Sequence, residues 1–171
     1  MKPAVVLFDD PRESGPLDLE SALGKRGPFR LVAVLEPEAA GPPAPSPAAA
    51  RYCFRHAAAK NGAARPSFVA SEAPAALLQL GAADFAVVAF VSPATVPLLV
   101  ALHGDARTRP FLRCGVTLPR LDRDYNLAQT LISEGKLHYH EHSQHVEEML
   151  PKRLKTMLRV QSARQAAGGA A

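Results

Sequence analysis

Apolar runs of strand length alternate with helical patterns along this chain, and that alternation constrains the fold more than any other feature. Five runs have the length and composition of strands, at residues 4–8, 29–35, 66–70, 85–91 and 115–118. Alternating strands and helices pack as a parallel sheet with right-handed crossovers. We therefore predict an α/β fold: a three-layer, Rossmann-like domain with a mostly parallel five-stranded sheet and a C-terminal helical extension.

The segments between the strands give the domain organisation. Residues 48–60 are rich in alanine and are expected to form a helix that Asn61-Gly62 ends. Over the 171 residues we expect an α/β core at 1–124, a helical extension at 125–161 and a disordered tail at 162–171. Within the extension, residues 136–142 do not distinguish helix from strand.

No segment has the pattern of a membrane span or of a signal peptide. The longest apolar stretch, at 85–102, is interrupted by Ser92, Pro93 and Pro97, so a strand followed by a helix is expected there. Two cysteines cannot build a disulfide framework, which favours a reducing compartment. We expect a cytoplasmic protein, with an organelle interior as the alternative.

The net charge of +4 is unevenly distributed. Residues 1–50 carry five basic and seven acidic side chains, a net of −2, and residues 51–171 carry fifteen and nine, a net of +6. The end of the extension is basic and contains Lys152, Arg153, Lys155 and Arg159. We predict that this helix binds phosphate or an acidic partner surface; the alternative is a solvated helix face.

Polar residues follow several predicted strands, where ligands of parallel sheets bind. They include Asp9, Asp10, Glu36, Ser92 and the segment after Leu118. The Asp9-Asp10 pair suits a cation or a ribose hydroxyl, or it caps the turn that follows. Neither a GxGxxG sequence nor a P-loop is present, which argues against a dinucleotide or NTPase site.

Four of the six histidines fall within eight residues, at His138, His140, His142 and His145. On a helix, three of them share one face, and on a strand a different three do. Three converging imidazoles suit zinc or nickel. The alternative is a solvated polar segment that titrates near pH 6.5, the ordinary range of histidine.

The order of features resembles the formyltransferase fold of methionyl-tRNA and glycinamide ribonucleotide formyltransferases. The resemblance rests on the second strand with its proline-rich loop, on residues 84–93, on the Gly115-Val116-Thr117-Leu118 strand and on the aspartates at 122 and 124. His103 stands where that family has the histidine of an Asn-x-His segment. The resemblance implies catalytic roles for His103, Asp122 and Asp124 and, in an active enzyme, a folate cofactor.

This chain departs from that family where the chemistry is done. Ala101 replaces the asparagine, and eleven residues between His103 and Gly115 leave no room for the usual loop and helix. Losing one oxyanion donor costs roughly 100–1,000-fold in rate. We therefore predict a degenerate, non-catalytic domain without a cofactor. It would be a subunit that binds a protein partner or a ribonucleoprotein assembly through the basic helix. The alternatives are an active formyl transferase and a metal-binding protein.

Overall fold

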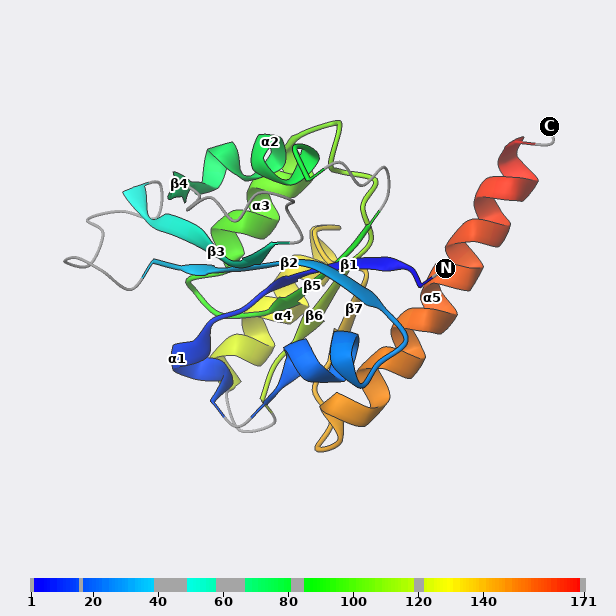
Figure 1. Cartoon of the computed structure of the whole chain (residues 1–171), viewed down its shortest axis with the longest axis horizontal. Helices are drawn as coiled ribbons and strands as arrows, with labels where there is room; N and C mark the ends of the chain where they lie inside the picture. The colour runs from blue at the N-terminus through cyan, green and yellow to red at the C-terminus, as the bar shows by residue number, and fades with distance from the viewer. Residues whose placement is uncertain are drawn as a thin grey trace.

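The computed structural model describes residues 2–15, 17–38, 49–57, 67–80, 85–118 and 122–169 (Figure 1). Its strands are β1 (Ala4–Phe8), β2 (Arg30–Pro37), β3 (Arg51–Ala57), β4 (Phe68–Val69), β5 (Ala86–Phe90), β6 (Arg113–Val116) and β7 (Tyr139–Glu141). Its helices and helical turns are α1 (Pro11–Ser14), η1 (Ser21–Lys25), η3 (Ala70–Glu72), α2 (Ala73–Leu78), α3 (Val96–Gly104), α4 (Asp122–Ser133) and α5 (Val146–Gly169).

The strands form one sheet in the order β4-β3-β2-β1-β5-β6-β7. Five of them, β1, β2, β5, β6 and β7, are parallel, while β3 runs antiparallel to both of its neighbours. The strand order reverses between β1 and β5, the place where open α/β sheets bind ligands. We call the side of the sheet at which β1 and β5 end the carboxyl edge, and the opposite side the amino edge.

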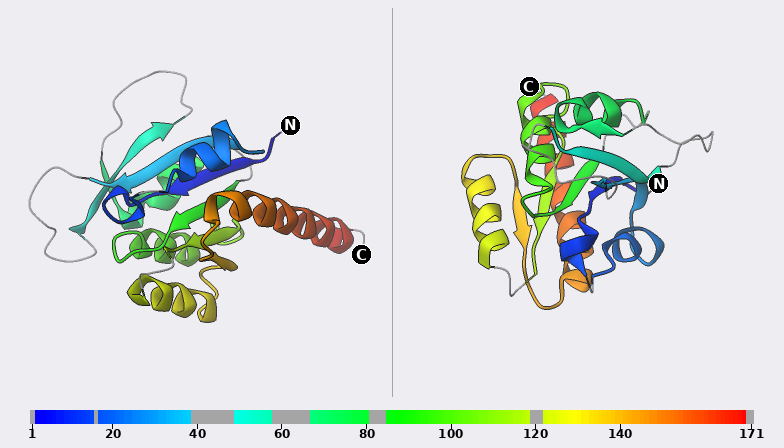
Figure 2. Two further views of the ribbon diagram at one scale, coloured as in Figure 1. Left: turned by 90° about the horizontal axis from the view of Figure 1, so that it is seen from below. Right: turned by 90° about the vertical axis from the view of Figure 1, so that its left-hand side faces the viewer.

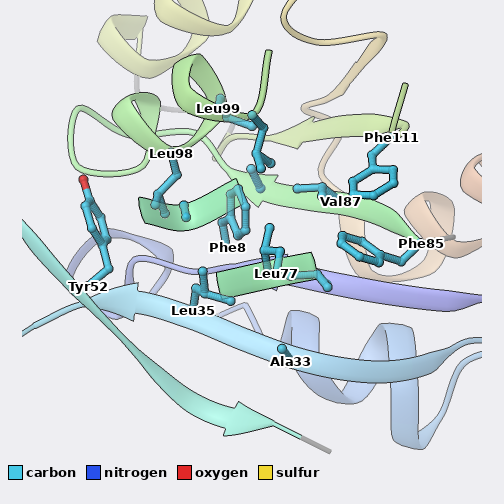
Figure 3. Packing of buried hydrophobic residues seen from close by; sticks show 14 of the residues in the cluster. Phe8, Ala33, Leu35, Tyr52, Leu77, Phe85, Val87, Leu98, Leu99 and Phe111 are labelled. Atoms are coloured by element: carbon cyan, nitrogen blue, oxygen red, sulfur yellow. The ribbon is translucent and has the colours of Figure 1, made fainter. Parts of the chain in front are cut away.

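Helices cover both faces of the sheet, which makes the three layers. On one face α2, α3 and α4 pack over a core that includes Phe8, Leu77 and Leu99 (Figure 3). On the other face η1 and α5 bury a second core, to which Leu23 and Leu150 contribute. The central strands β1 and β5 are buried throughout because both of their faces are covered. The predicted α/β, Rossmann-like, mostly parallel fold is confirmed, with seven strands in place of five.

One extra strand lies where the sequence analysis expects a helix. Within the predicted helix at 48–60, the described part forms β3, which pairs with β2 and β4. Tyr52 and Phe54, two residues apart, both contact the core, and Tyr52 is 1% exposed. This two-residue period of aromatic side chains outweighs the helix propensity of the flanking alanines. The expectation of a helix there is wrong.

The second extra strand is β7, which resolves the ambiguous stretch at 136–142. It pairs with β6 in the sheet, and the predicted boundary at residue 124 falls inside α4. Thus the sheet itself includes part of the predicted helical extension. The predicted disordered tail is also wrong as far as it is described, because α5 continues to Gly169, and the alanines, Arg164 and Gln165 before its last two glycines have good helix propensity.

The last helix, α5, is anchored along its first half only. Val146, Leu150 and Leu154 are buried against the sheet, and beyond Leu158 the helix extends past the amino edge (Figures 1 and 2). From 159 to 168 every residue except Gln161 is exposed. In the part of the chain that the structure describes, no helix is long and apolar enough to cross a membrane.

Candidate functional site

Two buried polar residues meet at the carboxyl edge, where the strand order reverses. Asp10 follows β1 and Ser92 follows β5, and the Ser92 hydroxyl donates to Asp10 Oδ2 over 2.7 Å. Asp10 is 4% exposed and Ser92 is 0% exposed. The Ser92 backbone N–H donates to Thr95 Oγ1, which fixes the start of the turn into α3. The hydrogen bond therefore connects β1 with β5 at the position where ligands bind in this class of sheet.

Two carboxyl groups are paired beside it, between α1 and α4. The carboxyl groups of Glu13 and Asp124 lie within reach of a hydrogen bond, Asp124 is completely buried, and Glu13 Oε2 and Asp124 Oδ2 have no other partner among the described residues. Arg123 donates to both, through Nε to Asp124 Oδ1 at 2.9 Å and through Nη2 to Glu13 Oε1. Burial, and next the hydrogen bond to Asp124, raise the pKa of Glu13. Two carboxyl groups bond only when one is protonated, so this pair keeps a proton to a higher pH than an isolated glutamate.

A single arginine serves three further carboxylates at the same edge. Arg55 of β3 pairs with Asp9 at 2.8 Å, with Glu20 at 2.7 Å and with Glu36 at 2.8 Å. Burial raises the pKa of Asp9, although Arg55 opposes that effect. Three carboxylates against one guanidinium leave a local excess of negative charge. The carboxyl edge therefore disfavours phosphate and other anions.

A histidine is fixed where β6 and β7 end. His140 Nε2 lies 2.6 Å from Thr117 Oγ1, and the His140 ring lies 5.3 Å from that of Tyr125 and 5.0 Å from that of His142, between centroids. Burial, and next the charge of His142, lower the pKa of His140 to about 4. His140 is therefore neutral at neutral pH, and its hydrogen bond joins the ends of β6 and β7.

The structure does not bring the predicted catalytic residues together. His103 is in the last turn of α3, and its Cε1 lies 4.0 Å from the place a Cβ would take on Gly135, just beyond the C-terminal end of α4. Asp122 and Asp124 are in the first turn of α4. A helix of 12 residues separates its ends by about 16 Å. His103 thus belongs to the amino edge and the two aspartates to the carboxyl edge, while Asp122 is exposed and Asp124 pairs with Glu13.

The four predicted metal ligands are also divided. His138 precedes β7, where its backbone N–H donates to the Arg113 carbonyl, and its pKa is lowered by burial and then by Arg113 and His103. His140 and His142 lie together at the other end of β7, and His145 is exposed before α5. Among the described residues no group of three or more His, Cys, Asp or Glu side chains is arranged to hold a metal ion. The convergence expected from the sequence therefore does not occur.

The basic residues of α5 differ in how free they are. Arg153 is engaged within the chain: Nη1 donates to the Tyr139 hydroxyl at 2.6 Å, and Nε lies 3.3 Å from Glu141 Oε2. Lys152 pairs with Glu148 one turn earlier, with both side chains about two-thirds exposed. Lys155 and Arg159 are exposed and form no ion pair with any described residue. Of the four predicted contact residues, these two are the most available to a partner.

Four residues of the carboxyl edge were not singled out from the sequence: Glu13, Glu20, Arg55 and Arg123. Glu13 and Arg123 lie 110 positions apart; Glu13 belongs to no periodic pattern or motif, and Arg123 lies between the two predicted aspartates without a predicted role of its own. The one available signal is that Glu13 follows Asp10 by three residues after a predicted strand, where the helical turn α1 forms. The predicted segment after Leu118 begins with residues 119–121, which lie outside the described ranges.

Comparison with known proteins gives no relative. No family model, no curated protein and no solved structure matches this chain.

Proposed function

We propose that this chain is a non-catalytic binding subunit, a degenerate formyltransferase-like domain of the cytoplasm that docks on a larger assembly through α5. One observation carries the proposal: the second half of α5 extends into solvent with nothing packed against it among the described residues. The first half supplies a rigid base, because Leu150 and Leu154 are fully buried.

The physical reason is that an isolated helical segment is unstable in water. Residues 159–168 make about three turns, shorter than the 12–15 residues at which isolated helices become even marginally stable. Continuity with the anchored half removes the cost of nucleation, but not the fraying of the free turns. A partner that packs along these turns would gain a preformed, partly ordered surface and would stop the fraying.

Charge supports the same assignment. Lys152, Lys155 and Arg159 are spaced i, i+3 and i+7, so they share a helix face that lies opposite the buried one. A partner held by this face would be acidic or polyanionic, and its association would weaken with salt. Catalysis finds less support, since His103 and the two aspartates at the start of α4 lie at opposite edges of the sheet.

Truncation tests the proposal. A chain that ends at Leu158 keeps every buried residue of α5, so it should fold with an unchanged melting temperature. In extracts of the native cells at low salt, the tagged full-length chain should elute in gel filtration well above its own mass of 18.2 kDa. The truncated chain should elute as the free protein. Equal elution of both chains, at either size, would contradict docking through α5.

A second variant separates charge from shape. Arg159→Glu keeps the full length of α5 but reverses one free charge on the docking face. The complex formed by this variant should dissociate to the free chain at a lower salt concentration than the complex formed by the unmodified chain. Arg12→Glu changes the net charge by the same amount on the exposed surface of α1, at the carboxyl edge, and should elute like the unmodified chain.

A further inference from the structure

The basic face of α5 continues onto the amino edge of the sheet. Lys2 precedes β1 and donates to the Gly27 carbonyl at 3.4 Å, while Arg30 begins β2. Gly27 and Lys155 in turn line one groove of about 570 Å³ between η1 and α5. We define the basic surface as five exposed residues on this side that form no ion pair within the described chain: Lys2, Lys25, Arg30, Lys155 and Arg159.

The acidic residues of the groove do not neutralise this surface. Glu147 pairs with Arg26 at 3.3 Å, and Glu148 pairs with Lys152 at 3.3 Å. Each of these two carboxylates is therefore balanced by a further base of the same groove. The five positive charges of the basic surface therefore remain uncompensated within the described residues, and Arg164, farther along α5, is likewise exposed and unpaired.

The two edges of the sheet consequently carry opposite charge. At the carboxyl edge three carboxylates share Arg55, and Glu13 and Asp124 share Arg123. The charge imbalance that the sequence presents as acidic and basic halves is, in space, a separation between the edges of one sheet. A large anion approaching the molecule is directed to the amino edge and α5.

The composition of the basic surface indicates the class of anion. It contains no aromatic side chain to stack on unpaired bases, and the one large apolar side chain exposed nearby is Val160, at 46%. Protein interfaces depend on buried aromatic or aliphatic anchors, and interfacial membrane helices need an apolar face, so both fit poorly. A phosphate backbone needs only spaced cations.

The geometry suits a duplex. Lys155 and Arg159 lie one turn apart on the exposed face of α5, and the helix extends beyond the body, so another molecule can reach it from several sides (Figure 2). Lys25 ends η1, which contacts α5, and Arg30 begins β2, which contacts η1. The cations therefore come from the body of the domain as well as from α5, and Lys155 also lines the groove between them.

We infer that the amino edge and α5 together bind the phosphate backbone of double-helical nucleic acid without reading its sequence. This inference rests on the proposed function, because it names the partner class of the docking helix. It assigns the binding to Lys155, Arg159, Lys25 and Arg30, and it leaves the carboxyl edge free.

Fluorescence anisotropy tests it with two labelled 20-base-pair probes, one an RNA duplex and one a DNA duplex, at 50 mM salt. We expect micromolar binding, with a slope of log K against log salt of about −3 to −5 for four or five phosphate contacts. Lys155→Glu should weaken binding about tenfold and reduce the slope by about 1 to 2. Arg12→Glu should change the affinity less than twofold.

Three results would overturn the inference. These are no binding of either probe at 50 mM salt, an equal loss for Lys155→Glu and Arg12→Glu, or competition by polyglutamate as strong as by unlabelled duplex. Nuclease treatment separates this failure from that of the proposed function. Suppose that the large complex survives complete nuclease digestion and still requires residues 159–168. Docking through α5 then stands, and a nucleic-acid partner is excluded. If digestion releases the free chain, the inference is supported.

Discussion

Glu13 in α1 and Asp124 in the first turn of α4, 111 positions apart in sequence, bring two carboxyl groups within reach of a hydrogen bond, and Glu13 Oε2 and Asp124 Oδ2 have no other partner among the described residues. Asp124 is completely buried, and the side chain of Glu13 is 25% exposed. The bond requires one proton, whereas the Arg123 guanidinium favours two negative charges. The balance between these effects makes this contact depend on pH.

Glu13→Gln should stabilise the protein at neutral pH. The pKa of Glu13 is raised in the folded state, so the stability of the unmodified protein falls as pH rises above the ordinary glutamate value of 4.5. Glutamine keeps a donor to Asp124 and does not ionise, and the lost pairing with the exposed Arg123 is worth little. The free energy of unfolding in urea should be compared between the two chains. The advantage of the variant over the unmodified chain should grow by about 0.5–1 kcal/mol from pH 4 to pH 7.5. If the difference in unfolding free energy between the variant and the unmodified protein is the same at pH 4 and at pH 7.5, the two carboxyl groups do not share a proton.

His140→Gln should reduce the loss of stability in mild acid. The folded-state pKa of His140 is about 4, below its ordinary 6.5, so the unfolded chain binds the proton first as pH falls. Stability is therefore lost between about pH 6.5 and pH 4. Between pH 7.5 and pH 5 the unmodified protein should lose about 1–2 kcal/mol more than the variant, whose amide can still bond to Thr117. His145→Gln, at an exposed position, is the control and should follow the unmodified protein.

Gly27→Ala should be strongly destabilising. A Cβ at Gly27 would lie 2.1 Å from the Ala22 carbonyl oxygen and 2.4 Å from that of Leu23, and backbone atoms of η1 cannot move aside without unwinding the turn. We expect a loss of about 2 kcal/mol or more in thermal or urea unfolding. Gly104→Ala, at the end of α3, meets no atom within 4 Å and is the matched control. If the two variants lose the same free energy of unfolding, the backbone of η1 does not pack against Gly27 as closely as described.

The layered fold was predictable because its signals are local. The run Phe85-Ala86-Val87-Val88 and the prolines that follow it, Pro93 and Pro97, place β5 and α3 almost where the sequence analysis expects them, although α3 begins only at Val96. The strand β3 was missed because its flanking alanines favour a helix, and only contact with the core reveals the role of Tyr52. Tertiary burial decided between two local preferences of similar strength.

The carboxyl edge was only partly predictable. Asp10 and Ser92 were identified because both directly follow strong strands, and adjacent parallel strands end side by side. The pairing of Glu13 with Asp124 depends on how α1 and α4 approach each other, which no spacing along the chain encodes. His103 fits the resemblance by order alone, and the length of α4 separates it from the aspartates.

The separation of charge between the two edges of the sheet was likewise only partly predictable from the sequence. Counting charges along the chain predicts a basic C-terminal helix, which α5 is. It cannot predict that Lys2, Lys25 and Arg30, from the more acidic first part of the chain, lie beside that helix. Parallel strands bring their starting residues to one edge, so residues far apart in sequence join one surface.

Hydrogen exchange of residues 159–168, read by mass spectrometry, tests the central claim of docking through α5 most directly. In the isolated protein these amides should exchange within seconds, because the free turns fray, while the amides of residues 150–158 stay protected. In the native assembly, or bound to duplex, residues 159–168 should become protected at least tenfold. Strong protection already present in the isolated monomer, or no change on binding, would contradict the account.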